Sequence, residues 1–148
     1  MDDKRIFIDT NILLTACHTS RHGYLSVVGF FENYPQMGYT FYISTQVLRE
    51  YLVVATRPLE VNGLGLSVDR ALANVDAFKE RCVCLEEHRG QLKRLFNILS
   101  EFGISGKRIH DANLVACMQE QGISNLLTFN RDDFKCFSKF INLVKLPS

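Results

Sequence analysis

Acidic side chains recur at the ends of predicted elements along this 148-residue chain. Asp9 directly follows the apolar run 6–8, Glu50 lies about two helical turns beyond a second apolar segment, and Asp111 falls in the first turn of a strongly apolar helix. Asp133 follows a later strand. Carboxylates are preferred ligands of hard cations such as Mg²⁺ and Mn²⁺, which activate water and stabilise phosphoryl displacements. The pattern therefore predicts a metal-dependent hydrolytic centre for phosphodiesters.

Each carboxylate also has a simpler structural explanation. Asp9 can cap a helix that follows it, and Asp111 can stabilise the positive end of a helix dipole. Glu50 lies off the apolar stripe of its helix, on a flank from which it can reach a cleft or remain solvated. Asp132 and Asp133 are common turn residues. The prediction of a site therefore depends on their joint placement.

The elements that must position these residues alternate in type. Strands are expected over 6–8, 40–43, 82–85, 125–129 and 140–144, and helices from 10, then over 21–34, 45–56, 67–79, 87–102 and 109–121, with a turn at 130–133. Ser44 or Thr45 and Ser67 can cap two of these helices, and the apolar stripe of helix 87–102 contains Leu92, Leu95, Phe96 and Leu99. This alternation predicts one α/β domain over residues 1–148, an α/β/α sandwich with a mainly parallel sheet. Ligands bind beyond the carboxyl ends of strands in such sheets, which is where the carboxylates fall.

Composition narrows the class of protein. The chain is 47% hydrophobic, enough for a buried core, and its formal net charge is +1. A general polyanion binder would be more basic, so nucleic-acid contact must depend on local patches or on metal. No signal peptide or membrane-length apolar run is recognised. Five cysteines in mostly apolar stretches resemble reduced thiols, so we expect a soluble cytoplasmic protein with no membrane partner.

Two other kinds of site are less compatible with the sequence. Cys17, His18 and His22 have the residue types of a zinc site but lack a fourth ligand at a recognised spacing. Asp9 could be the nucleophile of an aspartyl phosphotransferase. Enzymes of the haloacid dehalogenase class would show Asp-x-Asp-x-Thr there, whereas this chain has Asp9-Thr10-Asn11.

Four segments, in order, resemble the motifs of the PIN-domain ribonucleases. The motifs are an apolar strand with Asp-Thr-Asn, a strand-to-helix turn carrying a Glu, an Asp that opens a helix rich in small residues, and a Thr-containing loop. The matching segments are Ile6–Leu13, Ser44–Tyr51, Ile109–Ala116 and Leu127–Phe134. Within the family, the chain is most similar to the small VapC-type toxins of toxin–antitoxin pairs.

The resemblance implies an endoribonuclease that depends on Mg²⁺ or Mn²⁺, often forms a homodimer, and is inhibited by a cognate antitoxin. It implies that Asp9, Glu50 and Asp111 hold the metal, and that Glu50 can orient or deprotonate the attacking water. Asn11 and Thr128 are expected to hydrogen-bond the carboxylates. A non-catalytic PIN-like module that binds RNA or protein remains the alternative.

One position departs from the family pattern. Two residues after Thr128, the family often has Asp, whereas this chain has Asn130, which offers only a neutral carbonyl oxygen. We expect Asn130 to support the site and Asp133 to supply the fourth carboxylate, with Phe134 packed inward. The alternative is that Asp133 only caps the turn and three carboxylates suffice.

The sequence also suggests contacts outside the centre. Lys107 and Arg108 can contact phosphate or simply belong to a solvated loop. Helices 21–34 and 45–56 carry more aromatic and apolar residues than one small core should need, which predicts a homodimer through this region. These residues are Tyr24, Val27, Val28, Phe30, Phe31, Tyr34 and Tyr51.

Overall fold

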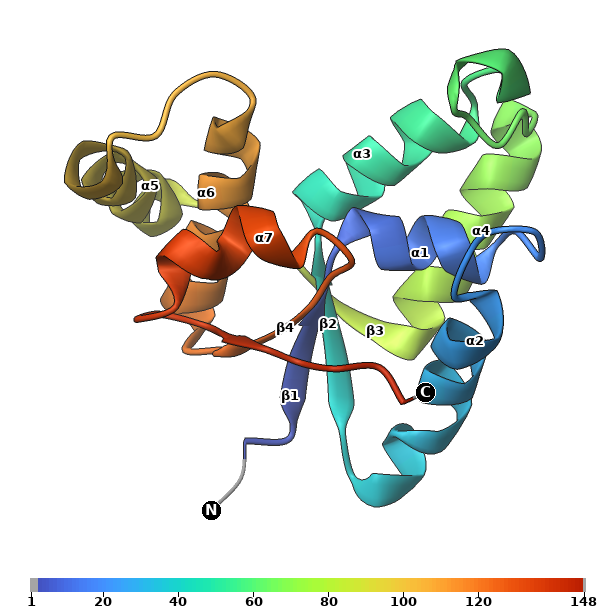
Figure 1. Cartoon of the computed structure of the whole chain (residues 1–148), viewed down its shortest axis with the longest axis horizontal. Coiled ribbons are helices and arrows are strands. Elements are labelled where there is room, and N and C mark those ends of the chain that lie inside the picture. Colours follow the sequence, from blue (N-terminus) through green and yellow to red (C-terminus); the bar gives the residue numbers. More distant parts are fainter. Residues whose placement is uncertain (1–2, 148) are drawn as a thin grey trace.

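The computed structural model describes residues 3–147, whose strands form one five-stranded sheet (Figure 1). The strands are β1 (Arg5–Ile8), β2 (Thr40–Ser44), β3 (Cys82–Leu85), β4 (Asn125–Leu127) and β5 (Asn142–Leu143). Their order across the sheet is β3-β2-β1-β4-β5, and every pairing is parallel. The predicted parallel α/β sheet is confirmed.

Helices cover both faces of this sheet. They are α1 (Thr10–Ala16), α2 (Tyr24–Asn33), α3 (Thr45–Ala55), α4 (Val68–Arg81), α5 (Arg89–Phe102), α6 (Arg108–Gln121) and α7 (Arg131–Phe134), with short 3-10 helices η1 (Pro35–Met37), η2 (Leu59–Val61) and η3 (Lys135–Phe137). In Figure 1, α5, α6 and α7 lie on one side of the strands and α1, α2 and α4 on the other. Strands enclosed in this way must be apolar on both faces, which explains the continuous apolar run of β1.

β1 is the central strand and brings distant segments together. Ile6, Phe7 and Ile8 are at most 1% exposed. Ile8 pairs with Leu127 of β4, and the next backbone N–H, that of Asp9, donates to the Leu127 carbonyl at 3.0 Å. The chain therefore leaves β1 and β4 at adjacent points of one sheet edge. Because β2 pairs with the other side of β1, this edge includes the switch point at which α/β folds bind ligands.

Polar side chains just before α1, α3 and α4 cap these helices. Asp9 accepts a hydrogen bond from the Thr10 backbone N–H at the start of α1. The Ser44 hydroxyl accepts one from Val47 N–H at the start of α3, and Ser67 likewise caps α4. Each satisfies a backbone donor that the helix itself leaves unpaired. The caps predicted at Ser44 and Ser67 are confirmed.

The structure differs from the predicted elements in several places, and two strands are shorter than predicted, β4 ending at Leu127 and β5 covering only Asn142–Leu143. Residues 131–134 form the short helix α7 where a turn was expected. α2 begins at Tyr24 because Gly23 has a φ of 87°, a left-handed conformation outside the helix. α5 buries Leu95 and Ile98, whereas Leu92 and Phe96, expected inside, are 50% and 58% exposed.

Three of the aromatic residues expected at a dimer surface lie in the core of the chain, whereas Tyr24 and Tyr34 are partly exposed. Phe30, Phe31 and Tyr51 are at most 9% exposed, and the Phe30 ring stacks on Phe41 of β2 with their centroids 5.2 Å apart. The phenylalanines pack between α2 and the sheet. These buried residues therefore cannot supply an interface, and a homodimer through this region remains a prediction.

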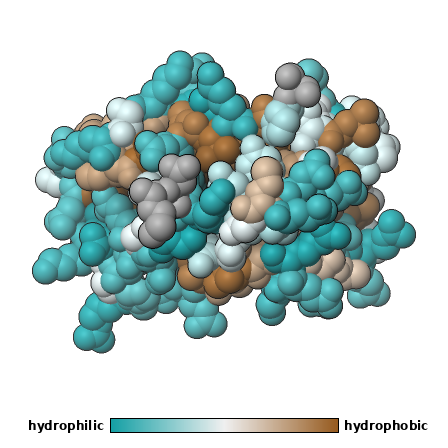
Figure 2. Space-filling model, turned by 90° about the horizontal axis from the view of Figure 1, so that it is seen from below, coloured by the Kyte–Doolittle hydropathy of each residue, from teal (hydrophilic) through white to brown (hydrophobic). Residues whose placement is uncertain are grey.

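The surface below the sheet is largely polar. Figure 2 looks from below at the end of the molecule where the strands begin, and shows a mostly hydrophilic face with separate hydrophobic patches. Within residues 3–147, the helices are all too short or too polar to cross a bilayer.

Candidate active site

A cleft of about 470 Å³ opens at the carboxyl end of β1, between α1, α3 and α6. It is lined by Asp9, Thr10, Asn11, Leu14, Glu50, Val53, Val54, Arg57, His110, Asp111 and Asn130. Five of the predicted site residues thus meet here from segments far apart in the sequence: Asp9, Asn11, Glu50, Asp111 and Asn130. Thr128 lies behind Asp9, and Asp133, Lys107 and Arg108 lie outside the lining of the cleft.

Asp9 is the most firmly held carboxylate of the cleft. It is 7% exposed, and its Oδ2 atom accepts hydrogen bonds from the Thr128 hydroxyl at 2.8 Å and the Asn11 amide at 3.2 Å. Its Oδ1 atom accepts from Thr10 N–H at 2.8 Å. The expected supporting hydrogen bonds of Asn11 and Thr128 are confirmed. Capping α1 and facing the cleft are therefore compatible, because each uses different lone pairs of one carboxylate.

Glu50 is held by its own helix and by α1. The Gln46 amide, one turn earlier in α3, donates to Oε1 at 3.0 Å, and the Thr10 hydroxyl donates to Oε2 at 3.3 Å. The Gln46 amide also donates to the His110 carbonyl of α6 at 2.9 Å. Because Gln46 is only 2% exposed, this contact fixes the spacing of α3 and α6 across the cleft. Glu50 is thus directed into the cleft rather than to bulk solvent.

Asp111 shows the electrostatic character of the cleft. Burial, followed by the negative charges of Asp9 and Asp133, raises its pKa to about 6, while Arg108 opposes the shift. Burial also raises the pKa of Asp9, and the hydrogen bonds from Thr128 and Thr10 N–H oppose that shift. Both carboxyls therefore resist ionisation in this cleft. A cation bound between them would stabilise the charged form of each.

The donor set fits a hydrated hard cation. Within residues 3–147, no three His, Cys, Asp or Glu side chains are gathered closely enough to enclose a metal ion. Mg²⁺ is commonly held by one or two carboxylates and keeps several water molecules. Asp9 and Asp111 fit that arrangement, with Glu50 placed to act directly or through water.

The region of the predicted fourth carboxylate is arranged by α7. Phe134 is fully buried, as predicted, and anchors this short helix to the core. Asn130 lines the cleft, and its backbone N–H donates to the Thr128 hydroxyl at 3.0 Å. Asp133 is exposed, yet it lies near enough to contribute to the raised pKa of Asp111. Asp133 as the fourth acidic group remains a prediction.

Arg108 has a structural contact that the sequence did not predict. Its guanidinium donates to the Asp133 carbonyl at 2.7 Å and contacts the Cys136 Sγ atom at 3.1 Å. The first residue of α6 is thereby connected to α7, which keeps Asp133 near Asp111. Lys107 is exposed beside it. Phosphate contacts by either residue remain predictions.

Sequence reasoning missed the polar network behind the carboxylates. The Asn113 amide of α6 donates to Gln46 Oε1 at 2.7 Å and to Glu87 Oε1 at 3.0 Å. Arg57 and His110 also line the cleft. A usable signal was the four-residue spacing of Gln46 and Glu50, since residues at that spacing share a helix face. The contacts of Asn113 have no comparable local signal because its partners lie on other elements.

The geometry agrees with comparisons against known proteins. The model of the PIN domain matches residues 6–139. Comparison with curated proteins gave no match. Solved structures share the fold: the Mycobacterium tuberculosis VapC20 toxin, described as cleaving the sarcin-ricin loop, has a TM-score of 0.71 at 16% identity, covering 96% of this chain and 99% of that one.

Two further solved structures are toxin–antitoxin assemblies. DNA-bound VapBC from Salmonella typhimurium matches with a TM-score of 0.66 at 18% identity, covering 96% of this chain and 98% of that one. VapBC-1 from nontypeable Haemophilus influenzae matches with a TM-score of 0.66 at 14% identity, covering 95% and 97%. At such identities the likeness concerns the fold, which is that of VapC-type proteins. The match over residues 6–139 extends through all four carboxylate-bearing segments, and the chain belongs to the PIN domain family.

Proposed function

We propose that this chain is a metal-dependent endoribonuclease that hydrolyses RNA phosphodiester bonds, through a nuclease domain that spans residues 1–148. The observation that carries the proposal is the convergence of Asp9, Glu50 and Asp111 in one cleft, with two of these carboxyls held at raised pKa. Mg²⁺ or Mn²⁺ bound there would polarise the phosphate and lower the pKa of a bound water.

The protein's own groups have separable roles in this proposal. Asp9 and Asp111 bind the cation, and Thr128 and Asn11 fix the direction of the Asp9 oxygens. Glu50, oriented by Gln46 and Thr10, accepts a proton as the water oxygen bonds to phosphorus and the leaving oxygen departs. Arg57, which lines the same cleft, is placed to contact a substrate phosphate.

The test is cleavage of a fluorescently labelled single-stranded RNA by the purified chain with Mn²⁺ or with EDTA. We expect cleavage that requires the metal, and a loss of at least ~100-fold in Asp9→Asn or Asp111→Asn, comparable with losing one strong electrostatic contribution. Asp76→Asn, an exposed carboxylate on α4, is the matched control and should retain activity. Full activity in either cleft variant would refute the mechanism. RNA binding without cleavage in the parent would favour the non-catalytic module.

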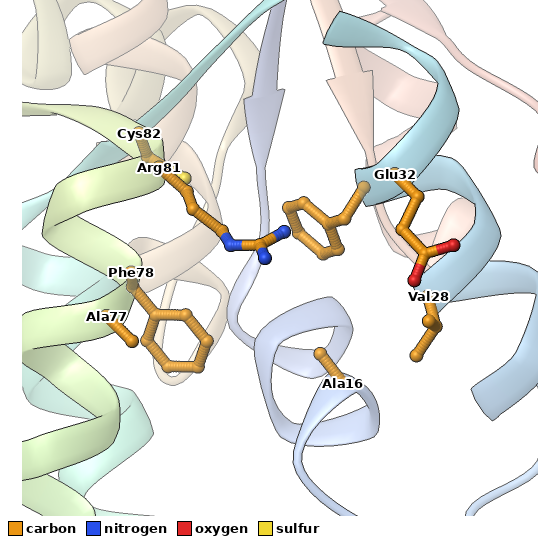
Figure 3. Close-up of a pocket in the computed structure, with 8 residues that line it drawn as sticks. Ala16, Val28, Glu32, Ala77, Phe78, Arg81 and Cys82 are labelled. Atoms are coloured by element: carbon orange, nitrogen blue, oxygen red, sulfur yellow. The ribbon is translucent and has the colours of Figure 1, made fainter.

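The fold relatives solved with antitoxins support a second part of the proposal, a cognate antitoxin partner. A separate pocket of about 220 Å³ lies between α1, α2 and α4, and apolar side chains such as Val28 and Phe78 line it. Figure 3 shows Arg81 reaching from α4 into this pocket, with Glu32 on the opposite, α2 side. Its mainly apolar lining suits a protein side chain better than a nucleotide.

Coexpression with the product of the adjacent upstream reading frame tests this pairing. Ala77 lines the pocket, whereas Ala73 is exposed on the same helix away from it. Ala77→Glu should weaken capture of the coexpressed partner, and Ala73→Glu should not. Equal capture by both variants would place the partner elsewhere.

All five cysteines are free thiols, which supports action in the reducing cytoplasm.

A further inference from the structure

A second depression adjoins the acidic cleft across helix α1. It measures about 450 Å³ and is lined by Asn11, Thr15, Arg21, His22, Phe129 and Asn130. Asn11 and Asn130 line the acidic cleft as well, so the two depressions adjoin at these side chains. Thr10 and Leu14 face the cleft, and Asn11 and Thr15, at the same four-residue spacing, face this depression, so α1 forms the wall between them. An extended ligand in the cleft would reach directly into the second depression.

Phe129 is an exposed aromatic residue held rigidly at this junction. It is 39% exposed, and its backbone N–H donates to Asn11 Oδ1 at 2.9 Å. The same Asn11 side chain donates to Asp9. On its other side the ring packs on Gly23, where an added Cβ would come within 3.0 Å of the Phe129 Cζ atom. The ring is therefore fixed relative to the carboxylates while part of it remains open to solvent.

Basic side chains stand beside this ring. Arg21 and His22 come from the loop between α1 and α2, and the Arg21 Nε atom donates to the Thr15 hydroxyl of α1 at 3.4 Å. A fixed aromatic face with a neighbouring guanidinium is a common means of binding single-stranded nucleic acid, because the ring stacks on a base and the cation pairs with phosphate. Asn130 adds an amide donor and acceptor for a base edge.

We propose that this depression, the Phe129 subsite, binds the nucleotide adjacent to the one whose phosphate is cleaved. Its base stacks on Phe129 and its phosphate pairs with Arg21. This inference rests on the proposed ribonuclease function and adds a residue that selects for an unpaired base near the cut. The adjoining acidic cleft and the two basic residues favour RNA over an apolar protein segment.

A tryptophan reporter tests the stacking directly, since the sequence has no tryptophan. Phe129→Trp, in an Asp111→Asn background that suppresses cleavage, should show saturable fluorescence quenching with a single-stranded oligoribonucleotide. Phe96→Trp in the same background is the matched control, because Phe96 is 58% exposed on α5 and outside the subsite. It should show no saturable change.

Binding and cleavage then separate stacking from a structural role. Phe129→Ala should weaken RNA binding by about 5- to 100-fold, the range for losing one stacked base, whereas Phe129→Tyr should bind like the parent. Phe129→Leu keeps apolar contact with Gly23 without the aromatic face and should also bind weakly. The parent should prefer an intact oligonucleotide to one with an abasic position beside the cut, and Phe129→Leu should lose this preference. Arg21→Ala should reduce the salt dependence of binding.

The outcomes distinguish this subsite from the nuclease proposal. Saturable quenching of the Phe129→Trp reporter, in a chain whose parent cleaves no RNA, would support stacking of an RNA base on residue 129 and refute the nuclease, and with it the position of this base beside a cut. Cleavage by the parent with no response from this reporter, and unchanged binding in Phe129→Leu, would refute the subsite and leave the nuclease intact. A response of the Phe129→Trp reporter to a coexpressed protein partner but not to RNA would also overturn the subsite.

Discussion

The carboxylates of the cleft are held in place before any ligand arrives. Asp9 accepts three hydrogen bonds and Glu50 accepts two, so their oxygens have little freedom to rotate. Asp111 is different, because within residues 3–147 only burial and charge account for its raised pKa. A bound cation would therefore offset a charge on Asp111 that no hydrogen bond from the described part of the chain stabilises.

This difference gives a pH-dependent stability. The pKa of Asp111 in the folded chain, about 6, lies above the ordinary value of 3.8, so folding disfavours its charged form. The penalty is fully present above pH 6 and disappears as the pH falls toward 3.8. The shift of Asp9 has the same sign. In EDTA, the melting temperature should therefore be higher at about pH 5.5 than at about pH 7.5.

Thermal melts of the parent and Asp111→Asn check this, and the variant separates the contribution of Asp111 from that of the rest of the chain. Asp111→Asn should show a smaller difference between the two pH values and should melt higher than the parent at the higher pH. Excess Mn²⁺ should stabilise the parent most at the higher pH. A parent that is more stable at the higher pH than at the lower one in EDTA would contradict the assigned shift.

Titration with Mn²⁺ tests whether Asp133 supplies the fourth acidic group of the site. Asp133→Ala should weaken Mn²⁺ binding several-fold, because Asp133 supplies negative charge near Asp111. Asn130→Asp should be tolerated and should tighten binding, since a carboxylate is a stronger ligand than an amide for a hard cation. Asp132→Ala is the control: this exposed residue pairs with Lys135 at 2.6 Å. If Asp133→Ala and Asp132→Ala both bind Mn²⁺ like the parent, Asp133 is structural and three carboxylates suffice.

At the scale of elements, two glycines test how tightly the chain packs. One lies in the loop after α3, where there is no space for a side chain, and the other lies in α2, where there is space. A Cβ at Gly63 would fall 1.9 Å from the Arg57 carbonyl oxygen, which also accepts from Gly65 N–H. Gly63→Ala should therefore cost about 1–3 kcal/mol by overpacking and disturb Arg57 in the cleft. Gly29 lies inside α2, with the Asn33 amide nitrogen 3.9 Å away as its nearest neighbour. Gly29→Ala should stabilise by about 0.5–1 kcal/mol.

Chemical denaturation of both variants checks this pair, and RNA cleavage adds a second readout. Gly63→Ala should lose both stability and activity, while Gly29→Ala should gain stability at unchanged activity. The opposite order of stability would show that the loop after α3 is looser than its contacts indicate.

Sequence reasoning succeeded for elements whose signal is local. The apolar run before Asp9 and the caps at Ser44 and Ser67 depend on neighbours in the chain, and each was predicted correctly. Residues 131–134 were misassigned because Asn and Asp favour turns as well as helix starts, and the burial of Phe134 decides between them. Likewise, periodicity predicts an apolar stripe on α5 but not which edge of it packs, so Phe96 was placed inside.

The candidate site shows the same division. The carboxylates could be predicted because they follow strands, and the parallel sheet brings strand ends together. The links from Gln46 to His110 and from Asn113 to Glu87 could not, since they join α3, α6 and the segment before α5 across the fold. The Phe129 subsite was also missed. A single aromatic residue does not indicate a binding site, and its neighbour Arg21 lies more than a hundred residues earlier in the sequence.

At the scale of the whole molecule, we predict a homodimer through a surface that begins on α3, within the predicted helix 45–56. Apolar side chains that remain exposed follow α3, η2 and the start of α4: Val53, Leu59, Val61, Val68 and Leu72. A stable interface there would bury on the order of 1,200–2,000 Å² in total. Light scattering at micromolar concentration should give twice the mass of the chain, and Val61→Glu should reduce it toward a monomer.

Leu92→Glu, at an exposed apolar position on α5, is the matched control and should leave the mass unchanged. A monomer in the parent at these concentrations would contradict the dimer. A dimer broken by Leu92→Glu but not by Val61→Glu would move the interface to α5.

Because β1 is the central strand, the site residue at its end depends on partners that are synthesised much later. Asp9 is synthesised before the Thr128 hydroxyl that orients it, which lies 119 residues later. At roughly 5–20 residues per second, a ribosome reaches Thr128 roughly 6–24 s after Asp9. Until then β1 lacks one of its two neighbours, and Asp111 joins Asp9 and Glu50 only late in that interval. A nascent chain that has not reached Thr128 therefore carries fragments of the cleft without its assembled centre, and under the proposed function it could not yet cut RNA.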